Sequence, residues 1–187
     1  MNQNLFIGEL VRLAAVNPDT DAEPFARWQS DSEYLRLLES DPFMPATSAQ
    51  MKRGIEKNFE RDLATRFEFM IRTLHEDKPI GAIGLGGVRW NHGDTFVGIG
   101  LGDRDYWGNG YGTDAMRVIL RYAFTELNLH RVSLDVFEYN PRAQRSYEKA
   151  GFKVEGRQRG VMQRDGRRWD YIFMGILRDE WLQNNVH

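Results

Sequence analysis

A glycine-rich segment, residues 107–113, is the stretch whose residue types and spacing point most directly to chemistry. It reads Trp-Gly-Asn-Gly-Tyr-Gly-Thr, with glycine at alternate positions. Glycine inside a strand or helix costs backbone entropy and buries no side chain, so the pattern predicts a loop. The apolar residues that follow recur at helical spacing, at Met116, Ile119, Leu120, Ala123, Phe124 and Leu127. A loop that leads into a helix presents unpaired N–H groups and the positive end of the helix dipole, which predicts an anion site.

Several kinds of anion site fit such a loop. The sequence has no Gly-x-x-x-x-Gly-Lys-Ser/Thr run, which excludes a P-loop nucleoside triphosphatase. Gly110, Gly112 and Ala115 match the Gly-x-Gly-x-x-Ala fingerprint of dinucleotide folds. That fingerprint should follow a strand directly, whereas residues 103–107 intervene here, and the downstream acid Asp135 lies within its predicted strand. A tight turn without a ligand is the remaining alternative.

Composition narrows the class of protein. The chain has 187 residues and a formal net charge of −2, which argues against a general nucleic-acid binder. It has no cysteine, and its four histidines are scattered without metal-ligand spacing, so we expect neither a disulfide framework nor a metal site. The first residues lack a charged region followed by a long apolar run, and no segment approaches 18 uninterrupted apolar residues, so we expect neither a secretory leader nor a membrane span. We therefore expect a cytoplasmic protein with no membrane attachment.

Regular elements flank the loop on both sides. Periodicity and turn residues predict helices at 21–40, 48–63, 113–127 and from Asn140–Pro141 to Gly151. Strands are predicted at 5–16, 67–74, 80–90, 95–102, 131–137, 154–163 and 169–177. The sequence thus predicts one α/β (α+β) domain over residues 1–187. Its sheet would be mixed and mostly antiparallel, with about six or seven strands flanked by about four helices.

Two ordered motifs resemble the GNAT superfamily of acetyl-CoA-dependent N-acetyltransferases. The loop is similar to the family's Gln/Arg-x-x-Gly-x-Gly/Ala, although Trp107 departs from it at the first position. The segment 140–152 resembles the family's Asn-x-x-Ala-x-x-x-Tyr-x-x-x-Gly-Phe helix and is the more specific motif. The resemblance extends over about residues 5–181. The nearest branches are the ribosomal-protein alanine and the bacterial spermidine acetyltransferases.

The resemblance implies that the chain uses acetyl-CoA as a co-substrate. The pantetheine arm would pair with residues 100–102, the pyrophosphate would lie on the N–H groups of residues 107–113, and Asn140 would flank the other side. Arg142, Arg145 and Lys149 form one helical stripe that either meets the phosphates or faces solvent. The expected cofactor-binding residues are Gly100, Leu101, Gly102, Trp107, Gly108, Asn109, Gly110, Tyr111, Gly112, Thr113, Asn140 and Arg145.

Acetyl transfer to an amine requires a polarised thioester carbonyl, a deprotonated amine and a stabilised thiolate. By resemblance Tyr147 is the proton donor to the thiolate, and a phenol is protonated at neutral pH. A backbone N–H near Leu101 would polarise the carbonyl. Asp135 is a candidate base, and ordered water is the alternative. Without the resemblance, Tyr147 would read as a half-buried helix aromatic.

The acceptor is less well defined by the sequence. The expected function is transfer to a primary amine, either a protein N-terminus or a small molecule, and a polyamine such as spermidine is the alternative. Acidic residues that would attract a polyamine, or merely form a polar helix face, are Glu23, Asp31, Glu33, Glu39 and Asp41. A CoA-binding sensor without turnover and an NAD-type oxidoreductase are the other hypotheses. The family also leads us to expect a homodimer.

Overall fold

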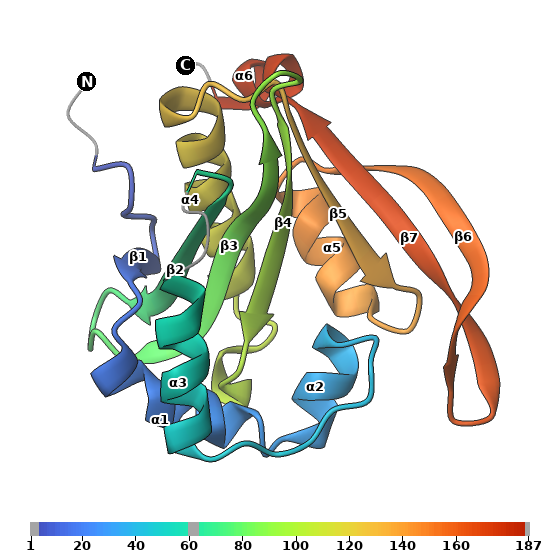
Figure 1. The fold of residues 1–187 in the computed structure, drawn as a ribbon. Helices are drawn as coiled ribbons and strands as arrows, with labels where there is room; N and C mark the ends of the chain where they lie inside the picture. The colour runs from blue at the N-terminus through green and yellow to red at the C-terminus, as the bar shows by residue number, and fades with distance from the viewer. Residues whose placement is uncertain (1–3, 60–63, 186–187) are drawn as a thin grey trace.

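The computed structural model describes residues 4–59 and 64–185 and contains one mixed seven-stranded sheet, shown in Figure 1. The strand order is β1-β2-β3-β4-β5-β7-β6, and the β4–β5 pair is parallel while the other neighbours are antiparallel. The strands are β1 (Val11–Ala15), β2 (Arg66–Thr73), β3 (Pro79–Arg89), β4 (Asp94–Leu101), β5 (Arg131–Phe137), β6 (Lys153–Arg164) and β7 (Arg167–Leu177). The predicted α/β fold with a mostly antiparallel sheet is therefore confirmed.

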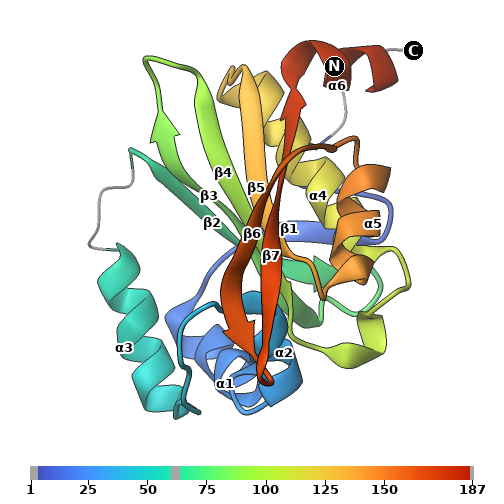
Figure 2. The same ribbon diagram turned by 90° about the vertical axis from the view of Figure 1, so that its right-hand side faces the viewer.

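The helices lie on both sides of this sheet. They are α1 (Pro18–Trp28), α2 (Ser32–Leu38), α3 (Ser48–Phe59), α4 (Tyr111–Arg121), α5 (Pro141–Lys149) and α6 (Arg178–Asn185). In Figure 2, α4 and α5 lie on one side of the sheet, and α3 lies on the other with α1 and α2 below the strands. None of the helices in the described ranges is long and apolar enough to cross a membrane.

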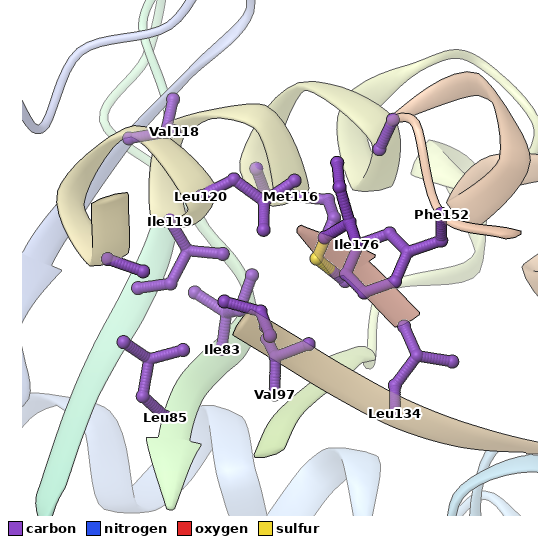
Figure 3. Packing of buried hydrophobic residues seen from close by; sticks show 14 of the residues in the cluster. Ile83, Leu85, Val97, Met116, Val118, Ile119, Leu120, Leu134, Phe152 and Ile176 are labelled. Atoms are coloured by element: carbon purple, nitrogen blue, oxygen red, sulfur yellow. The ribbon is translucent and has the colours of Figure 1, made fainter. Parts of the chain in front are cut away.

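The main core lies between α4 and the sheet. Met116, Ile119 and Leu120 are fully buried and point at sheet residues that include Ile83 and Val97 (Figure 3). These are the apolar positions that helical spacing predicted. This packing holds α4 against the sheet, so the position of its N-terminus relative to the end of β4 is fixed.

A second cluster covers the other face of the sheet. Trp28, Tyr34 and Leu35, from α1 and α2, pack with Met70 of β2. The Trp28 ring lies directly on Gly102, where any Cβ would overlap with it. Glycine at this position therefore lets α1 approach the end of β4.

The parallel pair β4–β5 separates shortly after it begins. Pairing joins only Asp94–Phe96 with Arg131–Ser133, and the described structure has no further pairing between the two strands. In Figure 1 the strands diverge from there, with α5 visible between them. The edge of β4 beyond Phe96 therefore has backbone groups that need partners from elsewhere.

Several boundaries differ from the sequence prediction. The predicted helix 21–40 is two helices, because the Asp31 carboxylate accepts from the N–H groups of Glu33 and Tyr34 and starts α2 anew. The predicted strand 5–16 is confined to β1, and residues 60–63 of the predicted helix 48–63 lie outside the described residues. Beyond α4, residues Tyr122–Glu126 form a π-helical turn. Helix α6 was not predicted, so the count of about four helices was too low.

Candidate active site

A cavity of about 460 Å³ lies where the end of β4 meets α2, α4 and α5. Ten of the expected site residues line it, and they come from β4, the glycine loop and α5. They are Gly100, Leu101, Trp107, Gly108, Gly110, Gly112, Thr113, Asn140, Arg145 and Tyr147. The fold thus brings the two sequence motifs to one space.

Four other expected residues do not line this cavity. Gly102 makes room for Trp28, as described above. The Asn109 side chain turns back to donate to the Asp105 carbonyl oxygen (3.1 Å), and the Tyr111 ring packs edge-on against Tyr106. Asp135 lies on β5, and its residue is exposed. For Asn109 and Tyr111, only the backbone is available for binding in this arrangement.

The glycine loop forms the anion-binding geometry that its sequence indicates. Gly108 and Gly110 have φ values of 80° and 91°, in the left-handed region that side chains disfavour. The first hydrogen bond of α4 runs from the Asp114 N–H to the Gly110 carbonyl (2.9 Å), and no side chain caps the helix. The N–H groups of residues 111–113 therefore have no acceptor within the helix. They are free to bind an anion.

Cationic side chains surround the cavity near this helix end. Arg117 of α4 and Arg142, Arg145 and Lys149 of α5 all line it, so the stripe on α5 meets the cavity. The nearby Asp114 carboxylate accepts hydrogen bonds from the N–H groups of Glu9 (3.1 Å), Leu10 (2.8 Å) and Val11 (3.0 Å). Three donors offset its charge, so the local field favours an anion.

Trp107 forms the cavity wall between the loop and β4. Its indole N–H donates to the Leu101 carbonyl oxygen (2.6 Å). The Arg142 guanidinium lies 3.8 Å from the indole centroid, and that of Arg104 lies 5.5 Å from it. This indole therefore connects the end of β4 to α5 through a hydrogen bond and a cation–π contact.

Tyr147 reaches the cavity from α5, whose start is fixed by Asn140. The Asn140 side chain accepts from the Ala143 N–H (3.2 Å) and caps the helix. The Tyr147 ring contacts Phe152 edge-on and packs against the main core. Burial, and secondarily the negative charge of Asp135, raises the pKa of the Tyr147 phenol above its usual value. The hydroxyl stays protonated at neutral pH and can donate a proton.

The pKa of the Asp135 carboxyl group departs from its usual value in the same direction. Burial disfavours its charged form and raises its pKa above the usual value. A carboxylate with a raised pKa accepts protons more readily, which suits a general base. The negative charge of Asp135 also raises the pKa of Tyr147, so the protonation states of the two groups are linked.

Residues 11–153 match the family model of the GNAT acetyltransferase domain. The chain belongs to the GNAT acetyltransferase family. It is 31% identical to the probable N-acetyltransferase YjcK of Bacillus subtilis (strain 168), over 86% of this chain and 91% of that protein. It is 27% identical to the uncharacterized N-acetyltransferase p20 of Bacillus licheniformis, over 86% and 89% of the two chains. The suspected family and enzyme class, an acyltransferase, are thereby confirmed.

The fold of this GNAT acetyltransferase is also that of known structures. The spermidine N-acetyltransferase from Vibrio cholerae in complex with CoA and spermine superposes with a TM-score of 0.80 at 23% identity. The match covers 92% of this chain and 98% of that one. At this identity the likeness establishes the shared fold.

Sequence reasoning missed the part of the acetyltransferase site that α2 and the N-terminal segment supply. The additional wall consists of Glu9, Leu10, Tyr34, Leu37 and Leu38. These residues are far from the two motifs in sequence and belong to no recognisable pattern. Only the packing of α2 over the end of β4 brings them to the site.

The acidic residues proposed to attract a polyamine are not all available. Arg104 pairs with both Asp31 and Glu33, at 2.5 Å to the Glu33 carboxylate. The single guanidinium offsets one of the two negative charges, so this group presents a reduced negative charge to a substrate. The basic residues of the last hairpin are used in a similar way: Arg157 pairs with Asp170, and Arg164 binds the Tyr139 hydroxyl (2.9 Å).

Proposed function

We propose that this GNAT protein transfers the acetyl group of acetyl-CoA directly to a primary amine, with Tyr147 as the proton donor. One observation carries the proposal: a single cavity connects the anion-binding end of α4 with the Tyr147 phenol. The family match supports the reaction class, and the Vibrio cholerae relative was solved with CoA.

The residues present fit acetyl-CoA. The free N–H groups of residues 111–113 and the cations Arg117, Arg142, Arg145 and Lys149 suit its phosphates. The unpaired edge of β4 beyond Phe96 offers backbone groups to the amides of the pantetheine arm. When bound, acetyl-CoA supplies an acyl group activated as a thioester.

Tyr147 and Asp135 provide the proton transfers that the reaction needs. As the C–N bond forms and the C–S bond breaks, the Tyr147 hydroxyl gives its proton to the departing sulfur, whose electron pair comes from the broken bond. The amine gives up its proton to Asp135, directly or through water. The raised pKa of each group suits its role, since the phenol remains an acid and the carboxylate becomes a better base.

Binding experiments test the co-substrate. Calorimetric titration should show binding of acetyl-CoA and CoA and none of NAD, and Gly110→Asp should abolish it. Arg145→Glu should weaken acetyl-CoA binding about tenfold but leave acetyl-pantetheine, which lacks the pyrophosphate and nucleotide, unaffected. Arg53→Glu is the matched control, because Arg53 is exposed on α3 away from the cavity. Binding of NAD, or none of CoA, would overturn the proposal.

Turnover experiments test the reaction and the acceptor. A panel of amines should include peptides with free N-termini, small primary amines and spermidine, with acetylated products identified by mass spectrometry. Steady acetylation that falls about a hundredfold or more in Tyr147→Phe supports the proposal. CoA binding without turnover of any amine would identify a sensor instead. Preference for spermidine over the peptides would favour the polyamine alternative.

A further inference from the structure

A second phenol, Tyr34 of α2, lies in the wall of the same cavity. Its side chain packs with Trp28, Leu35 and Met70, and the residue is only 6% exposed. Its hydroxyl lies over Gly100, where an added Cβ would be 2.6 Å from the oxygen. Tyr34 and Gly100 both line the cavity, so the hydroxyl sits at the cavity wall beside β4.

The Tyr34 hydroxyl has no hydrogen-bond partner among the described residues. Its own backbone N–H is satisfied by Asp31 (3.3 Å), but no protein group bonds the phenol oxygen. Buried tyrosines normally find a partner for the O–H, because an unmade hydrogen bond in an apolar setting is costly. By contrast, Tyr139 donates to the Arg36 carbonyl oxygen (2.7 Å). The Tyr34 oxygen is not one of the fully enclosed polar atoms, and its residue lines the cavity, so a ligand in the cavity can supply the partner.

The position of Tyr34 in the cavity decides which ligand group it meets. The free N–H groups of residues 111–113 belong to the start of α4, whereas Tyr34, Leu37 and Leu38 come from α2. Apolar side chains surround the hydroxyl there, and the nearest floor is the backbone of β4 at Gly100. No cationic side chain of α2 lines this end. A neutral donor held by packing suits an oxygen on which negative charge develops, because its dipole is already in place.

We propose that the Tyr34 hydroxyl donates a hydrogen bond to the carbonyl oxygen of the acetyl group and stabilises its charge during transfer. This inference rests on the proposed acetyltransferase function and adds a catalytic residue to it. The amine nitrogen forms its bond to the carbonyl carbon while the π electron pair moves to the oxygen, which Tyr34 stabilises without giving up its proton. When the pair returns, the C–S bond breaks, and sulfur takes its proton from Tyr147. Burial raises the pKa of Tyr34, so the phenol is the protonated donor across the neutral range.

The test compares Tyr34→Phe with Tyr122→Phe. Each substitution removes one partly or fully buried phenol O–H, but Tyr122 packs against Phe6, Phe67 and Phe69 away from the cavity. In Tyr34→Phe we expect kcat to fall about a hundredfold, with KM for acetyl-CoA and for the amine within about twofold of wild type. Tyr122→Phe should keep wild-type kcat. Urea unfolding of both variants establishes that each is folded at the assay temperature.

Each result of this comparison bears on the inference. An unchanged kcat in Tyr34→Phe, or a rise in the amine KM with kcat intact, would overturn it, the latter by assigning Tyr34 to amine binding. If Tyr34→Phe were too unstable to assay, the same comparison would be made at a lower temperature at which urea unfolding shows both variants to be folded. A kcat equal to that of wild type under those conditions would overturn the inference. Failure of the proposed function is distinguishable, because then the wild-type protein itself would not acetylate any amine.

Discussion

The indole N–H of Trp107 donates to the carbonyl oxygen of Leu101 across the cavity wall, at 2.6 Å. Leu101 is the last residue of β4, at the point where the strand edge is unpaired. Other family members have glutamine or arginine at the first loop position, and those side chains also carry N–H donors. Tryptophan therefore keeps a donor here and adds a flat surface, on which Arg142 stacks at 3.8 Å.

Replacing Trp107 with phenylalanine should separate its two contributions. Trp107→Phe removes the indole N–H but retains an aromatic ring for Arg142. Loss of the hydrogen bond should lower the free energy of unfolding by about 1 kcal/mol and weaken acetyl-CoA binding about five- to tenfold. Urea denaturation and calorimetry measure the two effects.

Trp90→Phe is the control for this substitution. The Trp90 indole donates to the Ala64 carbonyl oxygen (2.8 Å) but lies outside the cavity. It should lose a similar amount of stability and keep wild-type acetyl-CoA affinity. Equal affinity losses in both variants would mean that the Trp107 hydrogen bond does not shape the site.

Gly110 should be intolerant of any side chain. It begins α4 with φ of 91°, which costs an L-residue roughly 1–2 kcal/mol. An added Cβ would also lie 3.4 Å from the Leu10 side chain. Gly110→Ala should therefore destabilise the fold by about that amount and lower acetyl-CoA affinity, as measured by thermal shift with and without the ligand.

The same substitution at Gly54 should have the opposite sign. Gly54 lies within α3 with no atom within 4 Å of an added Cβ. Alanine is favoured over glycine in a helix by about 1 kcal/mol, so Gly54→Ala should stabilise the protein without changing ligand binding. A destabilising Gly54→Ala would show that the comparison reflects something other than backbone conformation.

The sequence predicted the local parts of this site and missed its long-range parts. The glycine loop, the apolar face of α4 and the Asn140 cap are all encoded within a few residues, so spacing alone identified them. Tyr34 reaches the cavity because α2 starts afresh at Asp31. That carboxylate also pairs with Arg104, which is distant in sequence. No local pattern specifies such a contact, and a continuous helix over residues 21–40 was the simpler interpretation.

Helix α6 and the short strand β1 also depend on contacts that local sequence patterns do not specify. The first turn of α6 is stabilised by Glu180, which accepts from the Leu177 N–H (3.0 Å) and pairs with Lys153. Its polar sequence has no apolar face that periodicity can detect. The residues before β1 have a strand-like sequence, but they do not extend the strand. The N–H groups of residues 9–11 donate instead to the Asp114 carboxylate. Tertiary hydrogen bonds overrode local preference in both places.

Asp114 should be important for stability, because its carboxylate binds the backbone of the N-terminal segment. Asp114→Ala leaves the N–H groups of Glu9, Leu10 and Val11 without their acceptor. Because hydrogen bonds to a buried carboxylate are strong, we expect a loss of about 3 kcal/mol in the free energy of unfolding. Hydrogen exchange at residues 9–11 should accelerate. Asp105→Asn, an exposed carboxylate in the same loop region, should change neither quantity. Unchanged exchange in Asp114→Ala would contradict this role.

The carboxyl group of Asp135 should make stability depend on pH in a predictable direction. Its pKa is raised in the folded protein, because burial disfavours the carboxylate. Folding therefore favours the protonated form. The contribution of the protonated Asp135 carboxyl to the free energy of unfolding is fully present below the unfolded-state pKa. It is lost as pH rises through the folded-state pKa. At pH 7 the wild-type protein folds with a partly desolvated negative charge, whereas Asp135→Asn does not.

Asp135→Asn should consequently be more stable than wild type at pH 7, and the difference should shrink as pH falls and the wild-type carboxyl becomes protonated. Urea denaturation at a series of pH values measures this difference, with Glu76→Gln on an exposed turn as the control that should show no such trend.

The Asp135→Asn variant also tests whether Asp135 is the general base. If Asp135 accepts the amine proton, its kcat/KM should fall about a hundredfold at pH 7, and if water does so it should remain near wild type. Gain of stability together with loss of rate would be the signature of a charge kept at the site for chemistry.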